Sequence, residues 1–466
     1  MSCSILIDCG LFEKRIAVIQ DDKLTDFIIE HEETKSVLEN IYLGRISGFS
    51  DTMDGAFVDL GGKVSGLLLS RNIPASGLAD APARQKLHDG EKCIVQVIKD
   101  AKDGKAAQLS AYIELGNPDL IYKPLSNGIV FAKKFKDKTA KQDIRGAFGT
   151  FDGGATVRSR AITKSTSSLK YYFEALQSDW KAIQNDVQTS QTPRLLRSAL
   201  PLELKLATEH MVDTPAIVTN DPTRYKELTS TIKTEKLTHA TCALWTKPDL
   251  LFDVYHIEQQ IEDASSKRLP LPSGGNITIE ETEALVVIDV NSGANDKSTG
   301  LQSVTFSTNA EGARLLAEQL RIRNLSGIII IDFIQMSQKE EHRKIEAILR
   351  QETNNDPSAV RVIGMTELGL MQLTRQRKRP PLSAANNAAI MCGTDFVPRA
   401  AATQLMTDIQ RYTNSNKTRQ ISLSVSPDLA PLLAHNQRSI ENALSVNLKW
   451  EMNLALRGFE FNLSHP

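Results

Sequence analysis

The 466-residue chain has few cysteines, no long apolar run and almost no net charge. Its five cysteines are scattered with no Cys-x-x-Cys pair, which predicts free thiols in a reducing compartment and excludes a cysteine-held zinc site within one chain. No apolar stretch approaches the roughly 18–20 residues that span a membrane. No basic segment precedes an apolar one at the start, so no signal peptide is expected. These absences predict a cytoplasmic protein with no membrane partner.

The near-neutral charge conceals a strongly basic segment. The 55 Lys+Arg and 56 Asp+Glu residues give a net charge of −1, which argues against a wholly basic nucleic-acid binder. Residues 121–170, however, hold eleven basic and three acidic side chains, a net charge of +8, and the remaining 44 basic and 53 acidic residues carry −9. A solvated lysine-rich loop explains this segment, and so does a surface for a polyanion, whose phosphates supply sequence-independent affinity.

Composition and strand pattern describe a folded chain with a β-rich part near its start. A hydrophobic content of 41% and a charged content of 24% exclude collagen-like and disordered classes, and the length predicts about three domains. Five short segments between residues 40 and 115 are rich in β-branched and aliphatic residues: IYLGRISGF, GAFVDLGG, SGLLLS, CIVQVIKD and AAQLSAYIEL. They fit an OB-type barrel, which presents one face to single-stranded nucleic acid, although other small barrels share the pattern.

From residue 280 the pattern changes to apolar strands that alternate with helices. The strands are expected at 284–290, 327–333 and 360–365, and the helices at 309–323 and 338–353. Continuous apolar strands of this kind predict a mostly parallel α/β sheet with both faces covered. An Ala/Asn-rich linker follows Pro380-Pro381, and the last 65 or so residues read as a small α+β unit with strands QISLSVS and NLKWEMN.

Asp289 and Asp332 lie at the carboxyl ends of two of these apolar strands. In an open α/β sheet, ligands bind in the crevice beyond those ends, so neighbouring strands would aim both carboxylates at one crevice. Paired carboxylates repel unless they share a proton or a cation, and hard oxygen ligands with waters left over suit Mg²⁺. Asn291 falls on the same side of the extended chain as Asp289 and is placed to orient that carboxylate. Each aspartate alone is equally well explained as a turn residue. The spacing of the two does not distinguish between a nuclease, a phosphatase and a kinase.

Longer motifs around these residues resemble a known family. The segments LPSGGNITIEETEALVVIDVNSG, FSTNAEGARLLAEQLRIRNLSGIIIIDFIQM and GLMQLTRQRKR closely resemble the catalytic region of the ribonuclease E/ribonuclease G family. NIYLGRISGFSDTMDGAFVDLGGKVSGLLL resembles its OB-fold RNA-binding domain, GATVRSRA its 5′-end sensor, and VSPDLAPLLAHNQRSIENAL its small C-terminal domain. The resemblance covers nearly the whole chain.

The resemblance implies a mixed multidomain α/β fold. An OB-fold β-barrel is inserted in an RNase H-like domain, followed by an α/β DNase I-like catalytic domain and a small α+β domain. The implied domains are 1–36 (RNase H-like, first part), 37–115 (OB-fold), 116–201 (5′-end sensor), 202–264 (RNase H-like, second part), 265–386 (DNase I-like), 387–400 (linker with no zinc link) and 401–466 (small C-terminal domain).

The resemblance also assigns roles to individual residues. Asp289 and Asp332 match the family's Mg²⁺-binding aspartates, with Mn²⁺ as an alternative metal, and Asn291 matches the asparagine that positions the first of them. These three residues are the expected catalytic set.

Four further residues match positions that contact RNA in the family. Phe57 and Lys105 match OB-domain residues that hold RNA near the site. Arg158 matches the arginine that contacts a 5′-monophosphate, and Ser159 stands where the family often has threonine.

Several positions depart from the family pattern. Leu67 replaces a common aromatic residue, and Gln335 replaces a common acidic one. Glu367 falls where many members have a basic residue near the 5′ phosphate, which argues against stimulation by a 5′-monophosphate. The Cys-Pro-x-Cys zinc link is missing, since only Cys392 lies in that region, so no zinc is expected and any homodimer would form without a zinc link.

These observations predict a Mg²⁺-dependent endoribonuclease in RNA processing or decay, of ribosomal precursors or messengers. Its substrate would be single-stranded, A/U-rich RNA, cleaved by a metal-activated water. The family resemblance implies products with a 5′-phosphate and a 3′-hydroxyl. The basic run Arg375, Arg377, Lys378 and Arg379 would contact phosphate or form a solvated helix end. The chain ends soon after the small domain, as in the shorter, ribonuclease G-like members.

Two alternatives remain at this stage. One is a catalytically weakened RNA-binding protein of the same family. The other is a Mg²⁺-dependent phosphotransferase, which predicts a GxxxxGK[ST] loop that the sequence lacks.

Overall fold

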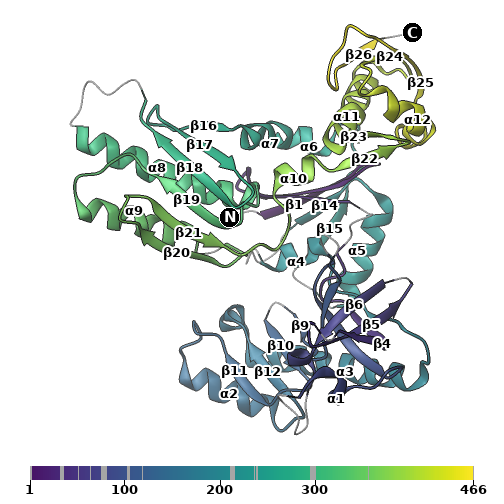
Figure 1. The fold of residues 1–466 in the computed structure, drawn as a ribbon, viewed down its shortest axis with the longest axis vertical. Coiled ribbons are helices and arrows are strands. Elements are labelled where there is room, and N and C mark those ends of the chain that lie inside the picture. The colour runs from purple at the N-terminus through teal and green to yellow at the C-terminus, as the bar shows by residue number, and fades with distance from the viewer. Residues whose placement is uncertain are drawn as a thin grey trace. The chain divides into compact units, whose positions relative to one another are not determined.

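The computed structural model divides into two compact units, Met1–Thr34 with Val212–Pro466 (unit 1) and Lys35–Met211 (unit 2) (Figure 1). It describes residues 3–31, 36–50, 52–62, 64–74, 81–101, 105–117, 119–209, 216–235, 237, 240–293, 301–354 and 356–464. No helix within these ranges is long and apolar enough to cross a membrane. Unit 2 is an insertion in unit 1, and the finer division into seven segments stays a prediction.

The first half of unit 2 is a closed five-stranded barrel. The barrel strands are β4 (Ile41–Ser50), β5 (Gly55–Gly61), β6 (Val64–Leu69), β7 (Lys92–Lys99) and β8 (Ala107–Ser110). They follow the order β4-β5-β6-β8-β7, and β7 pairs back with β4 to close the sheet. Alternate residues such as Val58, Leu68 and Leu109 fill the interior, because successive side chains of a strand point to opposite faces. The predicted OB-like barrel is confirmed.

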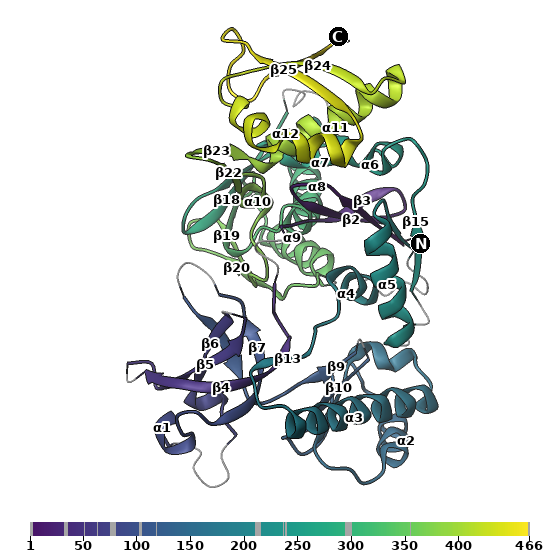
Figure 2. The ribbon, with the colours of Figure 1, turned by 90° about the vertical axis from the view of Figure 1, so that its right-hand side faces the viewer.

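The second half of unit 2 packs two helices on a four-stranded sheet (Figure 2). Its elements are β9 (Leu115–Gly116), β10 (Leu120–Lys123), β11 (Gly128–Phe131), β12 (Gly154–Val157), α2 (Lys138–Phe148) and α3 (Thr166–Thr189). The sheet order is β11-β12-β10-β9. Phe173 of α3 is the centre of the core, stacked on Phe148 with ring centroids 4.2 Å apart. Strand β13 (Arg194–Arg197) then returns to pair with β4, and α4 (Leu202–Glu209) follows.

Unit 1 begins with a five-stranded sheet made from two distant parts of the chain. Its strands are β1 (Cys3–Cys9), β2 (Lys14–Gln20), β3 (Lys23–Glu30), β14 (Ala216–Thr219) and β15 (Thr241–Leu244), in the order β15-β14-β1-β2-β3. Helix α5 (Pro222–Thr234) connects β14 to β15, and α6 (Leu251–Val254) and α7 (Ile257–Ser265) follow β15. Because β1 pairs in parallel with β14, the insertion of unit 2 between them leaves this sheet continuous.

The second sheet of unit 1 carries the two predicted catalytic aspartates. Its strands are β16 (Arg268–Pro270), β17 (Asn276–Glu281), β18 (Leu285–Asn291), β19 (Gly327–Asp332), β20 (Val360–Met365) and β21 (Met371–Arg375), with α8 (Leu301–Ile322) and α9 (Lys339–Glu352). The order is β16-β17-β18-β19-β21-β20. The predicted strands and helices are present here, and their ends differ by at most one residue from those expected, except that α8 begins eight residues before the expected start at residue 309.

The prediction of a mostly parallel sheet covered on both faces is wrong. Among the described strands of this sheet, only the β18–β19 pair is parallel, because the strands that flank it, β17 and β21, both run antiparallel to their neighbours. Helices α8 and α9 pack on one face, over residues such as Ile288 and Ile329. On the other face Val287 and Ile328 remain 39% and 52% exposed. The apolar runs are therefore half-buried strands whose outward positions also happen to be aliphatic.

The C-terminal region is a small α+β unit, as predicted. Its elements are α11 (Arg399–Asn416), β24 (Gln420–Val425), α12 (Ala430–Leu444), β25 (Asn447–Met452) and β26 (Phe461–Ser464). The segment expected to be a linker has regular structure instead, with α10 (Leu382–Asn386) followed by a hairpin of β22 (Ala389–Cys392) and β23 (Asp395–Pro398). Cys392 is buried in the core of the small unit, which anchors this hairpin.

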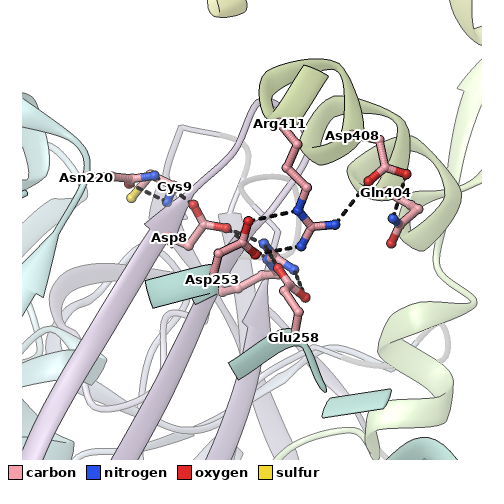
Figure 3. Close-up of polar contacts among 9 residues, drawn as sticks. Asp8, Cys9, Asn220, Asp253, Glu258, Gln404, Asp408 and Arg411 are labelled. Carbon is pink, nitrogen blue, oxygen red and sulfur yellow. Dashed lines mark hydrogen bonds and ion pairs between the residues drawn. The ribbon is translucent and has the colours of Figure 1, made fainter. Parts of the chain in front are cut away.

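Two arginines join distant segments of unit 1, and Figure 3 labels one of them, Arg411, with its partner Asp253. Arg411 on α11 donates to both carboxylate oxygens of Asp253 on α6, at 2.8 and 2.6 Å. Arg15 on β2 contacts Asp8 at 3.0 Å and Glu258 on α7 at 2.9 Å. These charge-assisted bonds fix the first sheet against α7 and the C-terminal unit against α6.

Candidate active site

Asp289 and Asp332 are neighbours at the carboxyl ends of the two parallel strands. They are register partners in the β18–β19 pair, and adjacent strands lie about 4.8 Å apart. Both side chains are exposed, on the sheet face that α8 and α9 leave open. This places two carboxylates side by side at the surface, each on a rigid strand.

Asn291 makes the contact with Asp289 that its spacing suggests. Its side-chain Nδ2 donates a hydrogen bond of 2.7 Å to Oδ2 of Asp289. Two residues along a strand bring a side chain back to the same face, which is why the contact is local. The bond restricts rotation of the Asp289 carboxylate.

Two neighbouring carboxylates are a donor set that fits Mg²⁺. In the described part of the chain no group of three or more His, Cys, Asp and Glu side chains is arranged to hold a metal. A cation at Asp289 and Asp332 would therefore take its other ligands from water and from phosphate oxygens, which is how Mg²⁺ is usually bound.

Two loops that adjoin the aspartate pair are held tightly. A Cβ on Gly293 would lie 2.3 Å from the carbonyl oxygen of Gly274, so the chain leaving β18 passes directly against the loop before β17. Beyond β19, Asn309 of α8 donates to the carbonyl oxygen of Ile334 at 2.8 Å and accepts from its N–H at 3.0 Å. Asn309 is buried, and sequence reasoning missed it because an isolated asparagine within a helix has no motif.

The barrel places Phe57 beside the substituted position Leu67. Phe57 on β5 and Leu67 on β6 are register partners, and Leu67 pairs with Gln108 on β8, so these three side chains share one face. Phe57 is 37% exposed, whereas Leu67 is buried. Lys105 is exposed and lies two residues before β8. Phe57 thus remains a flat apolar surface on the outside of the barrel.

Arg158 and Ser159 directly follow β12, an inner strand of the second sheet of unit 2. Arg158 is exposed, and its N–H donates to the carbonyl oxygen of Asp119 at 2.9 Å. The neighbouring chain is β11, because the N–H of Ala132 donates to the carbonyl oxygen of Val157 at 2.8 Å. Lys133 therefore leaves β11 next to Arg158. The sequence did not single it out among eleven basic residues, and only strand pairing distinguishes it.

Comparison with known proteins tests whether the chain belongs to the family that its motifs resemble. A model of the ribonuclease E/G family matches residues 117–378, more than half of the chain. The chain belongs to the ribonuclease E/G family. The resemblance deduced from the motifs is confirmed.

Three relatives show how far the similarity extends. The chain is 28% identical to ribonuclease E of Escherichia coli (strain K12), with 93% of this chain and 42% of that protein covered. It is 27% identical to ribonuclease E of Haemophilus influenzae, with 97% and 50% covered. Ribonuclease G of Escherichia coli (strain K12) is 27% identical, with 93% and 92% covered. The chain thus spans half or less of the two ribonuclease E proteins and nearly all of ribonuclease G.

In this family member the first residue of the basic run is withdrawn from solvent. Arg375 is buried at the end of β21 and pairs with Asp356 at 2.8 and 3.0 Å. Arg377 donates to Ser326 at 3.3 Å, and Lys378 donates to the carbonyl oxygen of Pro357 at 2.6 Å. The segment is a strand end rather than a helix end, so both sequence interpretations are wrong for Arg375.

Glu367 lies at the exposed tip of the β20–β21 hairpin. The turn is closed by a hydrogen bond of 2.7 Å from the N–H of Thr366 to the carbonyl oxygen of Leu370, and Gly369 has a φ of 85°. The position thus displays a negative charge to solvent.

Proposed function

We propose that this chain is a Mg²⁺-dependent endoribonuclease that cleaves single-stranded RNA in RNA processing or decay. The observation that carries the proposal is the Asp289–Asp332 pair on adjacent parallel strands, with Asn291 bonded to Asp289. Membership of the ribonuclease E/G family supports it. An A/U-rich substrate and products with a 5′-phosphate and a 3′-hydroxyl belong to the same proposal.

Asp289 and Asp332 would hold the cation between their carboxylates, and Asn291 would keep the Asp289 carboxylate turned toward it. When bound, Mg²⁺ lowers the pKa of a coordinated water and offsets charge that develops on phosphate oxygens. The exposed face of the sheet leaves room for a phosphodiester next to both carboxylates. The buried Asn309 keeps the chain after Asp332 in place.

RNA would be held by the barrel and recognised at its 5′ end. Phe57 offers a surface on which an unpaired base stacks, and Lys105 a charge for a phosphate. Stacked bases of a duplex are unavailable to such a surface, which accounts for a single-strand preference. Arg158, the Ser159 hydroxyl and Lys133 would bind a 5′-monophosphate, whereas Glu367 would repel it if the two approach each other.

The finer architecture belongs to this proposal too. We assign an RNase H-like fold to the first sheet of unit 1, where an antiparallel trio is extended by two parallel strands, and a DNase I-like fold to the second. A cytoplasmic location and a homodimer without a zinc link are further expectations.

The test is cleavage of a fluorogenic A/U-rich single-stranded oligonucleotide with and without Mg²⁺. Wild-type protein should cleave it only with the metal, and Asp289→Asn and Asp332→Asn should each lower the rate by about 10²-fold or more, given the size of such electrostatic contributions. Asp428→Asn, an exposed aspartate between β24 and α12, serves as the matched control and should keep full activity.

A catalytically weakened RNA-binding protein is the second candidate, favoured by the replacement of an aromatic at Leu67 and of a basic residue at Glu367. It predicts that wild-type protein binds the oligonucleotide without metal-dependent cleavage. That result, or cleavage that persists in the Asp289→Asn/Asp332→Asn double variant, would rule out the proposed reaction.

A further inference from the structure

A row of polar side chains crosses four adjacent strands of the second sheet of unit 1, β16 to β19 (Figure 1). Asp289 and Asp332 form one end of the row, on β18 and β19. Thr278 of β17 is the register partner of Asp289, and Arg268 of β16 is the register partner of Thr278. Because directly opposite residues point to the same face of a sheet, Arg268 shares the face of the aspartate pair.

Burial confirms the direction in which Arg268 points. Its neighbour Leu269 is buried in the core with α8 and α9, whereas Arg268 is exposed. Successive residues of a strand point to opposite faces, so Arg268 lies on the face that these helices leave open. At about 4.8 Å between strands, the α-carbons of Arg268 and Asp289 are two strands, or roughly 10 Å, apart.

The guanidinium of Arg268 is held by a residue next to the aspartate pair. Its Nε donates a hydrogen bond of 2.8 Å to Oδ1 of Asn276 on β17. Asn276 is the register partner of Asn291, the residue that donates to Asp289. The side chain of Arg268 therefore reaches from β16 over β17, toward the strand that carries Asp289.

The rest of the guanidinium has no partner of its own. Within the described part of the chain Arg268 forms no ion pair, and neither Nη1 nor Nη2 makes a hydrogen bond. Its neighbour Lys267, by contrast, pairs with Glu280 at 2.6 Å. Asp289 and Asp332 also lack a cationic partner among the described residues. An unpaired arginine beside two unpaired carboxylates complements a phosphate group that is bound together with a divalent cation.

The hairpin that carries Arg268 is anchored on β18. The turn between β16 and β17 is fixed by a hydrogen bond of 2.8 Å from the N–H of Leu271 to the carbonyl oxygen of Gly275. Gly275 lies against the carbonyl oxygen of Asn291, since a Cβ there would be 2.5 Å from that atom. Arg268 is thus held in a fixed place on the open face, so less freedom is lost when a ligand binds.

We propose that Arg268 binds the phosphodiester held at Asp289 and Asp332, and that Asn276 positions its guanidinium. This deepens the proposed function and rests on it in taking RNA as the ligand of the aspartate pair. The two free edges of the planar guanidinium form paired hydrogen bonds with phosphate oxygens. A donor fixed at this place also stabilises the negative charge that develops on those oxygens during cleavage.

The first test measures RNA binding without metal or cleavage. The full chain with Asp289→Asn/Asp332→Asn binds a fluorescein-labelled 20-nucleotide single-stranded A/U-rich RNA in EDTA, and anisotropy gives the slope of log Kd against log salt. Adding Arg268→Gln should reduce the slope by about 0.7, the value for one phosphate contact with a single strand. Lys267→Gln removes the same charge from the adjacent, paired residue and should leave the slope unchanged. Arg268→Lys, which keeps the charge, should also leave it unchanged.

The second test measures cleavage by the chain with both aspartates intact. Arg268→Gln should lower kcat/KM by about 10²-fold, the size of effect seen when one preorganised donor is lost. Arg268→Lys should recover part of the loss, because an ammonium keeps the charge but not the paired hydrogen bonds. Asn276→Ala should lower kcat while keeping the salt slope, and it should have no further effect once Arg268→Gln is present. Far-ultraviolet circular dichroism checks that each variant is folded.

An unchanged salt slope in the Arg268→Gln variant would overturn the proposal, as would an equal fall in the Lys267→Gln control. A higher Mg²⁺ requirement as the sole effect of Arg268→Gln would show that the residue acts on the carboxylates and would also overturn it. A lower slope with full cleavage activity would place the contact away from the aspartate pair. If wild-type protein shows no metal-dependent cleavage, the proposed reaction fails, and the binding test still reports whether Arg268 contacts a phosphate.

Discussion

The hydrogen bond from Asn291 to Asp289 is the most specific single-residue feature of the aspartate pair. Asn291→Ala frees the Asp289 carboxylate to rotate, and loss of such an orienting partner lowers metal affinity or activity by about 10–100-fold. We expect a fall of that size in the cleavage rate, with RNA binding in EDTA unchanged. Gln372→Ala, which alters a polar residue on the same sheet, is the control. Equal rates for Asn291→Ala and wild-type protein would show that the bond is dispensable.

The thiols near the chain start form a second residue-scale feature. Burial raises the pKa of Cys3 and of Cys9 from 9.0 to about 11, with a smaller contribution to Cys3 from the nearby Asp26 carboxylate. At pH 8 a shift of this size leaves about 100-fold less thiolate, the reactive form. Iodoacetamide should therefore label both cysteines much more slowly in native protein than in urea, as read by mass spectrometry.

The same shifts predict a loss of stability at high pH. The folded state holds these thiol protons more tightly than the unfolded state, so the stabilisation is complete below pH 9 and declines as the pH rises from 9 to 11. The fall in the urea midpoint over that range should be smaller in Cys9→Ala than in wild-type protein. Rapid native labelling at pH 8 would contradict both expectations.

At the scale of elements, the two faces of β19 differ in burial. Ile329 is fully buried under α8 and α9, whereas its neighbour Ile328 is 52% exposed on the open face. Ile329→Ala should lower the free energy of unfolding by about 3 kcal/mol, because it leaves a cavity in the core. Ile328→Ala is the matched control and should cost less than about 1 kcal/mol. Urea denaturation followed by circular dichroism measures both, and equal losses would mean that the open face is covered in solution.

This strand also shows what sequence could and could not predict. The positions of β18, β19 and α9 follow from local apolar periodicity, and the two aspartates from their place at strand ends. The mainly antiparallel order of the sheet does not follow from local periodicity, because tertiary packing determines that β17 and β21 pair with β18 and β19. Aliphatic residues on both faces of a strand look fully buried in sequence, and only the covering helices reveal that one face is open.

Contacts between distant segments were likewise beyond sequence reasoning. Asn291 and Asp289 are two residues apart, so their contact follows from strand geometry. Arg411 and Asp253 are 158 residues apart, and nothing in either sequence context marks them as partners. The burial of Arg375 against Asp356 is of the same kind, and it removed a residue from the predicted RNA-contact set.

At the scale of the whole molecule, the first and last segments of unit 2 contact each other. Glu39 pairs with Lys205 at 2.8 Å, and the N–H of Ala199 donates to Oδ1 of Asn40 at 2.7 Å. Strand β13 pairs with β4 alongside these contacts. A segment whose ends meet and which has its own apolar clusters meets the usual requirements of an autonomous domain.

We therefore expect residues 36–209 to fold alone, with a single cooperative urea transition and a near-ultraviolet circular dichroism signal from the packed aromatics. A version that stops at residue 190 lacks β13 and the Ala199 and Lys205 contacts, so it should unfold at lower urea. An isolated segment 36–209 that binds hydrophobic dye and shows no near-ultraviolet signal would mean that unit 2 depends on unit 1 for its packing.

The direct pairing of β1 with β14 predicts that unit 1 also folds without the insertion. Replacing unit 2 by a short Gly/Ser linker should leave unit 1 folded, as measured by urea denaturation and near-ultraviolet circular dichroism.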